Sequence, residues 1–149
     1  MKLLKLLQVV SIAVLLSTVI VLTNFAEVPA KITTIQIKTN FTPDPLVLNG
    51  KSGGQRASNC GNISASPNHI IQLTESVPYM RFTVEGDGQP TLLIDGPGGR
   101  FCTLSDAYSR SKLELSGYWQ AGNYSLYVGE VSARQYNYTL SISQQQKLK

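Results

Sequence analysis

Histidine is nearly absent from this sequence of 149 residues, which has His69 as its single histidine and Cys60 and Cys102 as its two cysteines. Nucleophilic catalysis needs an activated serine or cysteine beside a base, and one histidine leaves little from which to build such a pair. A zinc site needs about four ligands at short spacing, which these residues do not supply. We therefore predict that the protein is not an enzyme, and a small hydrolase that uses His69 is the least favoured alternative.

Runs of basic residues are also missing. The chain has 13 Lys and Arg against 9 Asp and Glu, a formal net charge of +4, but no two basic residues are adjacent. A protein that binds nucleic acid gathers its positive charge in a patch or stripe, so no nucleic-acid partner is predicted. The glycine-rich stretch 96–99 lacks the Lys-Ser/Thr of a phosphate-binding loop, and no nucleotide cofactor is expected.

One long apolar run is present, and it lies at the N-terminus. Residues 1–5 carry Lys2 and Lys5, residues 6–22 are almost free of polar side chains, and Val28-Pro29-Ala30 has the modest size that a signal peptidase reads. This pattern predicts a secretory signal peptide over residues 1–30, cut after Ala30. The alternative is an uncleaved membrane anchor over residues 3–22, since about 20 apolar residues can span a bilayer. Both interpretations place the remaining chain outside the cytoplasm, secreted or periplasmic, with membrane contact only through residues 3–22.

Helical periodicity is absent after residue 30, and a period of two takes its place. Residues 79–85 put Met80, Phe82 and Val84 on one face of an extended chain, which is typical of a half-buried strand. Similar runs recur between turn residues at spacings of about 8–12 positions. We predict an all-β domain over residues 31–143, a jelly-roll-like or Greek-key β-sandwich of about 7–9 antiparallel strands after the N-terminal signal helix, with a polar tail over 144–149.

The segments between these runs are predicted as loops and turns. They comprise a long loop over 49–62 rich in Gly, Ser and Asn, an interruption at Pro78, a tight hairpin turn at 96–99, and a turn over 117–122 that carries large aromatic side chains.

The two cysteines both lie in the exported part. An even number of cysteines in a small exported domain predicts a disulfide between Cys60 and Cys102. It would close a loop of about 40 residues, for which chain entropy alone gives roughly 3–4 kcal/mol of stability. Two free buried thiols are the alternative.

Three aspartates fall near predicted strand ends or in loops: Asp87, Asp95 and Asp106. Calcium sites combine such carboxylates with loop carbonyls, so these residues are the candidate ligands for a calcium ion. Their spacing is not that of an EF-hand, and aspartate is also an ordinary turn residue.

Aromatic residues near turns are the remaining candidates for binding. Tyr118 and Trp119 lie beside a glycine turn and Tyr108 lies in an irregular segment, and flat side chains at such positions can contact sugars or protein partners. For Trp119 we favour the alternative that it closes one end of the sandwich as part of the core.

Several of these stretches resemble one known family. The segments PTLLIDGPGGRFC (90–102), SGYWQAGNYSLYVGEV (116–131) and YNYTLSIS (136–143) are similar to the bacterial pre-peptidase C-terminal domain, and FTPDPLVLNGKSGG resembles a secreted version found in cyanobacterial proteins. The resemblance covers most of residues 41–143. It implies a jelly-roll-like β-sandwich of the kind often appended to secreted proteases, where it assists substrate or matrix binding, or secretion.

The resemblance also bears on the calcium hypothesis, because some relatives bind calcium through acidic loops. Here Cys102 is followed by Thr103-Leu104-Ser105-Asp106 where the family often has several aspartates, and Asn68 stands where relatives tend to have Asp. Both departures argue against a metal. No protease domain accompanies these motifs, and we expect a stand-alone copy that acts on a separate partner.

We therefore predict a secreted, non-enzymatic binding or accessory module that contacts protein or glycan at the cell exterior or in the periplasm. A membrane-anchored structural protein of the envelope is the alternative.

Overall fold

The computed structural model describes residues 32–106, 108–109 and 111–147. The predicted signal peptide or anchor lies outside these residues. In the described part every regular element is a β-strand, and no helix there has the length and apolar character needed to cross a bilayer.

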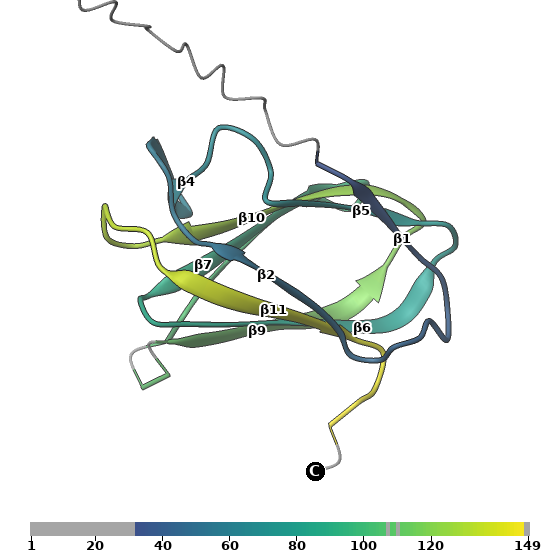
Figure 1. Cartoon of the computed structure of the whole chain (residues 1–149). Helices are drawn as coiled ribbons and strands as arrows, with labels where there is room; N and C mark the ends of the chain where they lie inside the picture. The colour runs from purple at the N-terminus through teal and green to yellow at the C-terminus, as the bar shows by residue number, and fades with distance from the viewer. Residues whose placement is uncertain (1–31, 107, 110, 148–149) are drawn as a thin grey trace, which may run out of the picture. The chain divides into compact units, whose positions relative to one another are not determined.

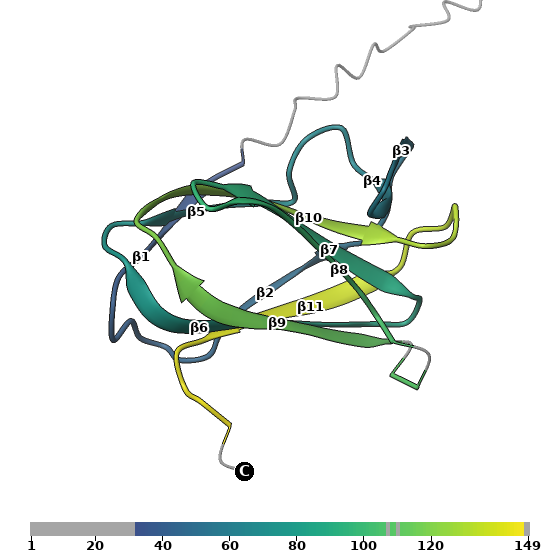
Figure 2. The ribbon, with the colours of Figure 1, turned by 180° about the vertical axis from the view of Figure 1, so that it is seen from behind.

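Within the described residues, eleven strands form two sheets, which face each other in Figures 1 and 2. In chain order the strands are β1 (Thr34–Ile37), β2 (Leu46–Lys51), β3 (Arg56–Ser58), β4 (Gly61–Ile63), β5 (His69–Leu73), β6 (Val77–Gly86), β7 (Pro90–Gly96), β8 (Gly99–Leu104), β9 (Lys112–Trp119), β10 (Gly122–Glu130) and β11 (Asn137–Ser143).

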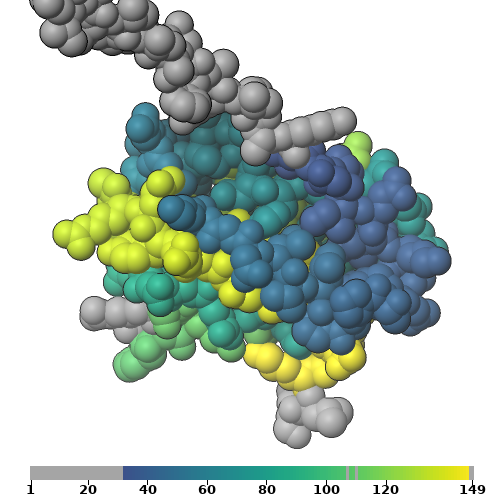
Figure 3. Space-filling view, viewed as in Figure 1, coloured from purple at the N-terminus to yellow at the C-terminus, as the bar shows by residue number. Residues whose placement is uncertain are grey.

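The larger sheet is organised around β10. Strand β10 pairs with β5 through its first half and with β7 from Ser125 to Glu130; β1 extends the sheet beyond β5, β8 extends it beyond β7, and the β3–β4 pair joins at Glu130. The smaller sheet has the order β2-β11-β6-β9. Figure 3 shows the early (blue) and late (yellow) segments side by side on one face, as the β2–β11 pairing requires.

The space between the sheets is filled by side chains of alternating residues. Met80, Phe82 and Val84 of β6 are buried, as the period of two predicts, and they meet Leu92 and Ile94 of β7 in the main core. Each such side chain contributes roughly 1.5–3 kcal/mol through removal from water. The predicted β-sandwich is confirmed, and the burial of alternate residues is what holds its two layers together.

The structure differs from the sequence predictions in several local features. The described part of the chain has eleven strands rather than seven to nine, because the expected loop over 49–62 contains the end of β2 and most of the short β3–β4 pair. Strands β1 and β5 run parallel rather than antiparallel. Pro78 lies within β6, where the pairing with β9 shifts between Val77 and Met80; such an irregularity tolerates a residue without an N–H. The hairpin turn at 96–99 is confirmed by the Gly96–Gly99 pairing.

The predicted disulfide is confirmed, with Cα atoms of Cys60 and Cys102 5.7 Å apart. It ties the β3–β4 pair to β8 across the outer face of the larger sheet. There Cys60 packs with Ile63 and Leu93 in a second, small hydrophobic cluster, and its carbonyl accepts a 2.6 Å hydrogen bond from the buried hydroxyl of Thr91. The bridge therefore covers a sheet face that would otherwise expose apolar side chains.

His69 links the two sheets. Its Nε2 lies 2.8 Å from the hydroxyl of Tyr138, a buried residue of β11, and the two rings meet edge to face. Burial lowers the pKa of His69 and raises the pKa of Tyr138, so both groups are neutral near pH 7.

We predict that this histidine makes the domain sensitive to mild acid. Because the pKa of His69 is lower in the folded state than its ordinary value of 6.5, the unfolded chain takes up its proton first, and stability falls as the pH drops below about 6.5. Urea unfolding between pH 5 and pH 7.5 should show this decrease in the wild type and lose most of it in His69→Gln.

Glu75 does not interfere in this range. Its pKa is lowered below the ordinary 4.5, chiefly by the hydrogen bond from the Thr39 hydroxyl, so its contribution is lost only at more acidic pH. An unchanged pH profile in His69→Gln would refute the assignment to His69.

Candidate functional site

An aromatic cleft lies between the ends of β8 and β9. Its volume is about 230 Å³, and its walls come from both sheets. We call it the aromatic cleft; it is lined chiefly by Phe101, Leu115, Tyr118, Trp119, Gln120 and Tyr124. Among the described strands, β8 pairs only with β7 and β9 pairs only with β6, so both are edge strands of their sheets (Figure 2). The cleft therefore lies at the edges of the two sheets.

Trp119 supports the cleft from within. The side chain is only 5% exposed, and its ring packs edge to face on Phe82, Phe101 and Tyr124, with centroids 4.7, 6.0 and 5.5 Å away. Its indole N–H donates a 3.1 Å hydrogen bond to the carbonyl of Met80. Trp119 thus closes one end of the sandwich, the role favoured from the sequence. It does so as the last residue of β9, not in a turn as predicted.

Tyr124 forms the back of the cleft. Its hydroxyl donates a 2.8 Å hydrogen bond to the carbonyl of Gln120, and burial is the main cause of its raised pKa. A Cβ atom on Gly96 would lie 2.2 Å from Cδ1 of this ring, which is closer than any side chain permits. Glycine at position 96 therefore allows the tyrosine ring to occupy this position.

The cleft offers aromatic surface to a ligand. Phe101 is 41% exposed and Tyr118 is 62% exposed. The indole N–H of Trp119 and the hydroxyl of Tyr124 are already hydrogen-bonded to backbone carbonyls of the protein. A volume of about 230 Å³ is below the roughly 300–1,000 Å³ of sites for drug-sized ligands. The arrangement suits one ring-sized or branched apolar group.

The other predicted contact residue, Tyr108, does not join the aromatic cleft. It is fully exposed in the segment after β8 and lines a separate cavity with Asp87, Glu130 and Tyr136. The structure therefore brings Tyr118 and Trp119 together and leaves Tyr108 apart.

The three aspartates proposed as calcium ligands occupy different places. Asp87 follows β6, Asp95 lies in β7 opposite Arg100, and Asp106 follows β8. The Asp106 carboxylate accepts hydrogen bonds from the backbone N–H groups of Tyr108 and Ser109, the ordinary role of aspartate in a turn. Across the described residues, no three His, Cys, Asp or Glu side chains gather as metal ligands would, so this set is not assembled.

One motif was missed in the sequence. The Gly-x-Ser-x-Gly spacing of a nucleophile elbow is present in Gly50-Lys51-Ser52-Gly53-Gly54. In the structure Ser52 is buried, its hydroxyl donates to the carbonyl of Tyr136 and accepts from the N–H of the same residue, and a loop follows it where the elbow requires a helix. The His69 ring is hydrogen-bonded to the Tyr138 hydroxyl and not to a serine. The geometry therefore gives no support to a hydrolase.

Sequence reasoning also missed Phe101, Tyr124 and Glu130. The sequence places Phe101 and Tyr124 in strands but does not show that both contact Trp119. That contact depends on which strands face each other. Glu130 is the buried acid at the end of β10; a single carboxylate in a sequence carries no sign of burial.

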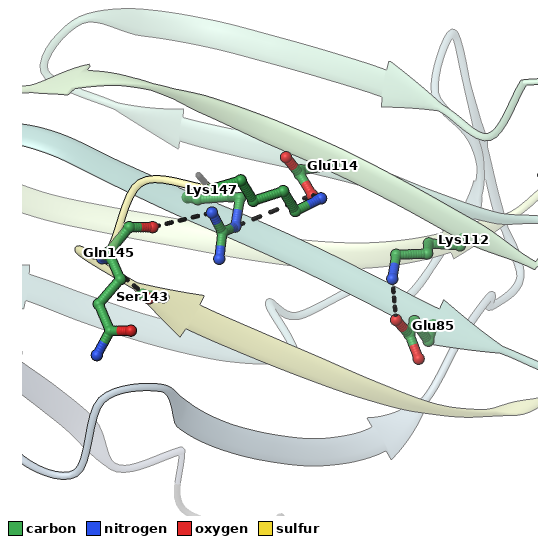
Figure 4. Close-up of polar contacts among 7 residues, drawn as sticks. Glu85, Lys112, Glu114, Ser143, Gln145 and Lys147 are labelled. Carbon is green, nitrogen blue, oxygen red and sulfur yellow. Dashed lines mark hydrogen bonds and ion pairs between the residues drawn. The ribbon is translucent and has the colours of Figure 1, made fainter. Parts of the chain in front are cut away.

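The outer face of the smaller sheet is polar. Glu85 pairs with Lys112, and Glu114 pairs with Lys147 and Arg81 (Figure 4). The Arg81 guanidinium also donates a 2.9 Å hydrogen bond to the carbonyl of Gln145. Ion pairs at a protein surface contribute about 0–1 kcal/mol each, and these pairs make the face unsuited to an apolar partner.

Comparison with known proteins finds a cyanobacterial relative and a domain of similar structure. No protein-family model matches the chain. An uncharacterized protein of Synechococcus elongatus is 40% identical over 102 residues, which cover 66% of this chain and 75% of that protein. The crystal structure of the pre-peptidase C-terminal domain of a Bacillus anthracis collagenase is similar over 75% of this chain and 96% of that domain, with 13% identity and a TM-score of 0.49. It is the domain type that the sequence motifs resemble; the fold assignment rests on the two hydrogen-bonded sheets described above.

Proposed function

This chain belongs to the same protein family as the uncharacterized Synechococcus elongatus protein, and we propose that it is a non-catalytic binding module exported from the cytoplasm. The export proposal rests on the basic and apolar pattern of residues 1–30 and on the disulfide, which is typical of proteins in oxidising compartments.

The observation that carries the binding role is the aromatic cleft. Phe101 and Tyr118 expose aromatic surface beside a cavity whose floor is fixed by Trp119. Well-packed aromatic residues around a small pocket are typical of the few positions that dominate the affinity of a protein interface. We therefore propose that the module binds a protein partner through an apolar anchor side chain seated in the aromatic cleft.

We predict that Tyr118→Ala weakens partner binding by about thirtyfold, equivalent to roughly 2 kcal/mol for loss of a central aromatic contact. Partners would be identified by co-purification with the exported protein from its host, and the affinity of each would then be measured. Trp119 is the only tryptophan in the chain, so its fluorescence reports directly on occupation of the cleft.

Val47→Ala is the matched control. Val47 is an apolar residue of β2 with 49% exposure, and it does not line the cleft. Partner binding that survives Tyr118→Ala and Phe101→Ala unchanged would rule out the cleft. Binding only to glycans, with no protein partner, would replace the proposed class of ligand.

A further inference from the structure

We propose that a second site, a polar groove at the opposite end of β9, binds a neutral oligosaccharide. The groove consists of two adjoining cavities of about 920 and 560 Å³ that share Asp87 and Ser111 in their walls. Lys112 begins β9 at the groove and Trp119 ends it at the aromatic cleft, a separation of roughly 23 Å along an extended chain. This site is therefore independent of the cleft.

The larger cavity crosses all four strands of the smaller sheet. Its floor follows the register Gly50–Tyr138–Gly86, where the tyrosine side chain is buried and points into the core. On either side of this line the side chains point outward: Asn49, Thr139, Glu85 and Lys112 form one row, and Lys51 and Asn137 belong to the other. Rows two residues apart are roughly 7 Å from each other, and four strands span roughly 14 Å. These are the dimensions of a short oligosaccharide lying across the strands.

The rows offer both donors and acceptors. The Thr139 hydroxyl donates a 3.0 Å hydrogen bond to Oδ1 of Asn49, which leaves the Asn49 amide N–H groups to donate outward. Glu85 and Lys112 form an ion pair (Figure 4). The other two charged residues of the cavity, Lys51 and Asp87, have opposite charges that cancel. Because the lysines and carboxylates of this cavity balance, its chemistry favours a ligand that is uncharged and rich in hydroxyls, since each hydroxyl both donates and accepts.

The smaller cavity adds a buried acceptor and an aromatic face. Glu130 is 1% exposed; its Oε1 accepts a 2.9 Å hydrogen bond from the N–H of Gln89, while its Oε2 has no hydrogen-bond partner within the described part of the chain. A Cβ on Gly88 would lie 2.4 Å from this Oε2 and 2.4 Å from Cδ2 of the Tyr136 ring. The carboxylate and the ring therefore both pack against Gly88 in the cavity wall. Buried acceptors are rarely left unpaired, and a water that bridges to a ligand hydroxyl can supply the donor. The Tyr136 ring gives a sugar a face on which to stack.

Titration calorimetry of the purified protein tests this proposal. The probes are cellohexaose and chitohexaose as neutral hexasaccharides, a heparin hexasaccharide as an anionic comparison, and hexalysine as a cationic one. We expect a neutral hexasaccharide to bind, and we expect Tyr136→Leu and Glu130→Gln each to weaken that binding about tenfold. Val47→Ala, on the same sheet but outside the groove, should bind as the wild type does.

Three outcomes would overturn the proposal: no heat from either neutral sugar at millimolar concentration, binding of heparin or hexalysine alone, or sugar binding that none of the variants changes. If Glu130→Gln does not fold, Tyr136→Leu and the exposed Asn137→Ala decide the question. No protein partner enters this assay, so its result is separate from that for the aromatic cleft.

Discussion

Trp119→Ala is expected to lower the free energy of unfolding by about 3–5 kcal/mol, the range for removal of a large aromatic side chain from a core. The substitution opens a cavity among Phe82, Phe101 and Tyr124. It also leaves the Met80 carbonyl without the indole N–H that it accepts, and an unpaired buried acceptor adds to the cost. Since the stability of a domain is about 5–15 kcal/mol, a loss of about 3–5 kcal/mol is a large part of the total.

The neighbouring residue provides the control. Tyr118 is 62% exposed where Trp119 is 5% exposed, so Tyr118→Ala should change stability by no more than about 0.5 kcal/mol. Urea unfolding followed by far-ultraviolet circular dichroism measures both variants without depending on tryptophan fluorescence. An equal decrease in the free energy of unfolding for the two substitutions would contradict the burial of Trp119 and the exposure of Tyr118.

Loss of the disulfide should have an effect of similar size. Cys60 and Cys102 are 42 residues apart, and opening a loop of this length costs roughly 3–4 kcal/mol in the chain-entropy model. The bridge also holds Cys60 against Ile63 and Leu93. The double variant Cys60→Ser, Cys102→Ser should therefore unfold at a clearly lower urea concentration than the wild type.

Reduction of the wild type supplies the matching measurement. The reduced wild type and the double variant should unfold at nearly the same urea concentration, and reductant should have no effect on the variant. Titration of two free thiols in the native, unreduced protein would show that the bridge does not form.

Much of the fold could be predicted because it depends on local patterns. The alternation of Met80, Phe82 and Val84 fixes which face of β6 is buried, and the turn at 96–99 fixes a hairpin. The errors occurred where a distant part of the chain decides the outcome. The pair β3–β4 is too short to be recognised from the sequence alone. It is held in place by the pairing of β4 with β10 and by the disulfide to Cys102. Likewise, Tyr118 and Trp119 stay in β9 because β6 pairs with that strand as far as Trp119.

The candidate sites were less predictable for the same reason. Trp119 could be assigned to the core from the sequence. Phe101 and Tyr124 contact it only because β8 and β10 of one sheet face β9 of the other. The polar groove depends on the register of four strands, and a shift of one residue would turn its side chains inward. Asp87, considered as a metal ligand, lies instead in the wall of this groove.

Site-specific photocross-linking of the exported protein tests the binding role most directly. A photoreactive phenylalanine analogue would be placed at position 118 beside the aromatic cleft and, for comparison, at position 47 on β2. The account predicts that a defined protein partner is captured from position 118 and not from position 47. Capture from both positions alike, or from position 47 alone, would contradict it.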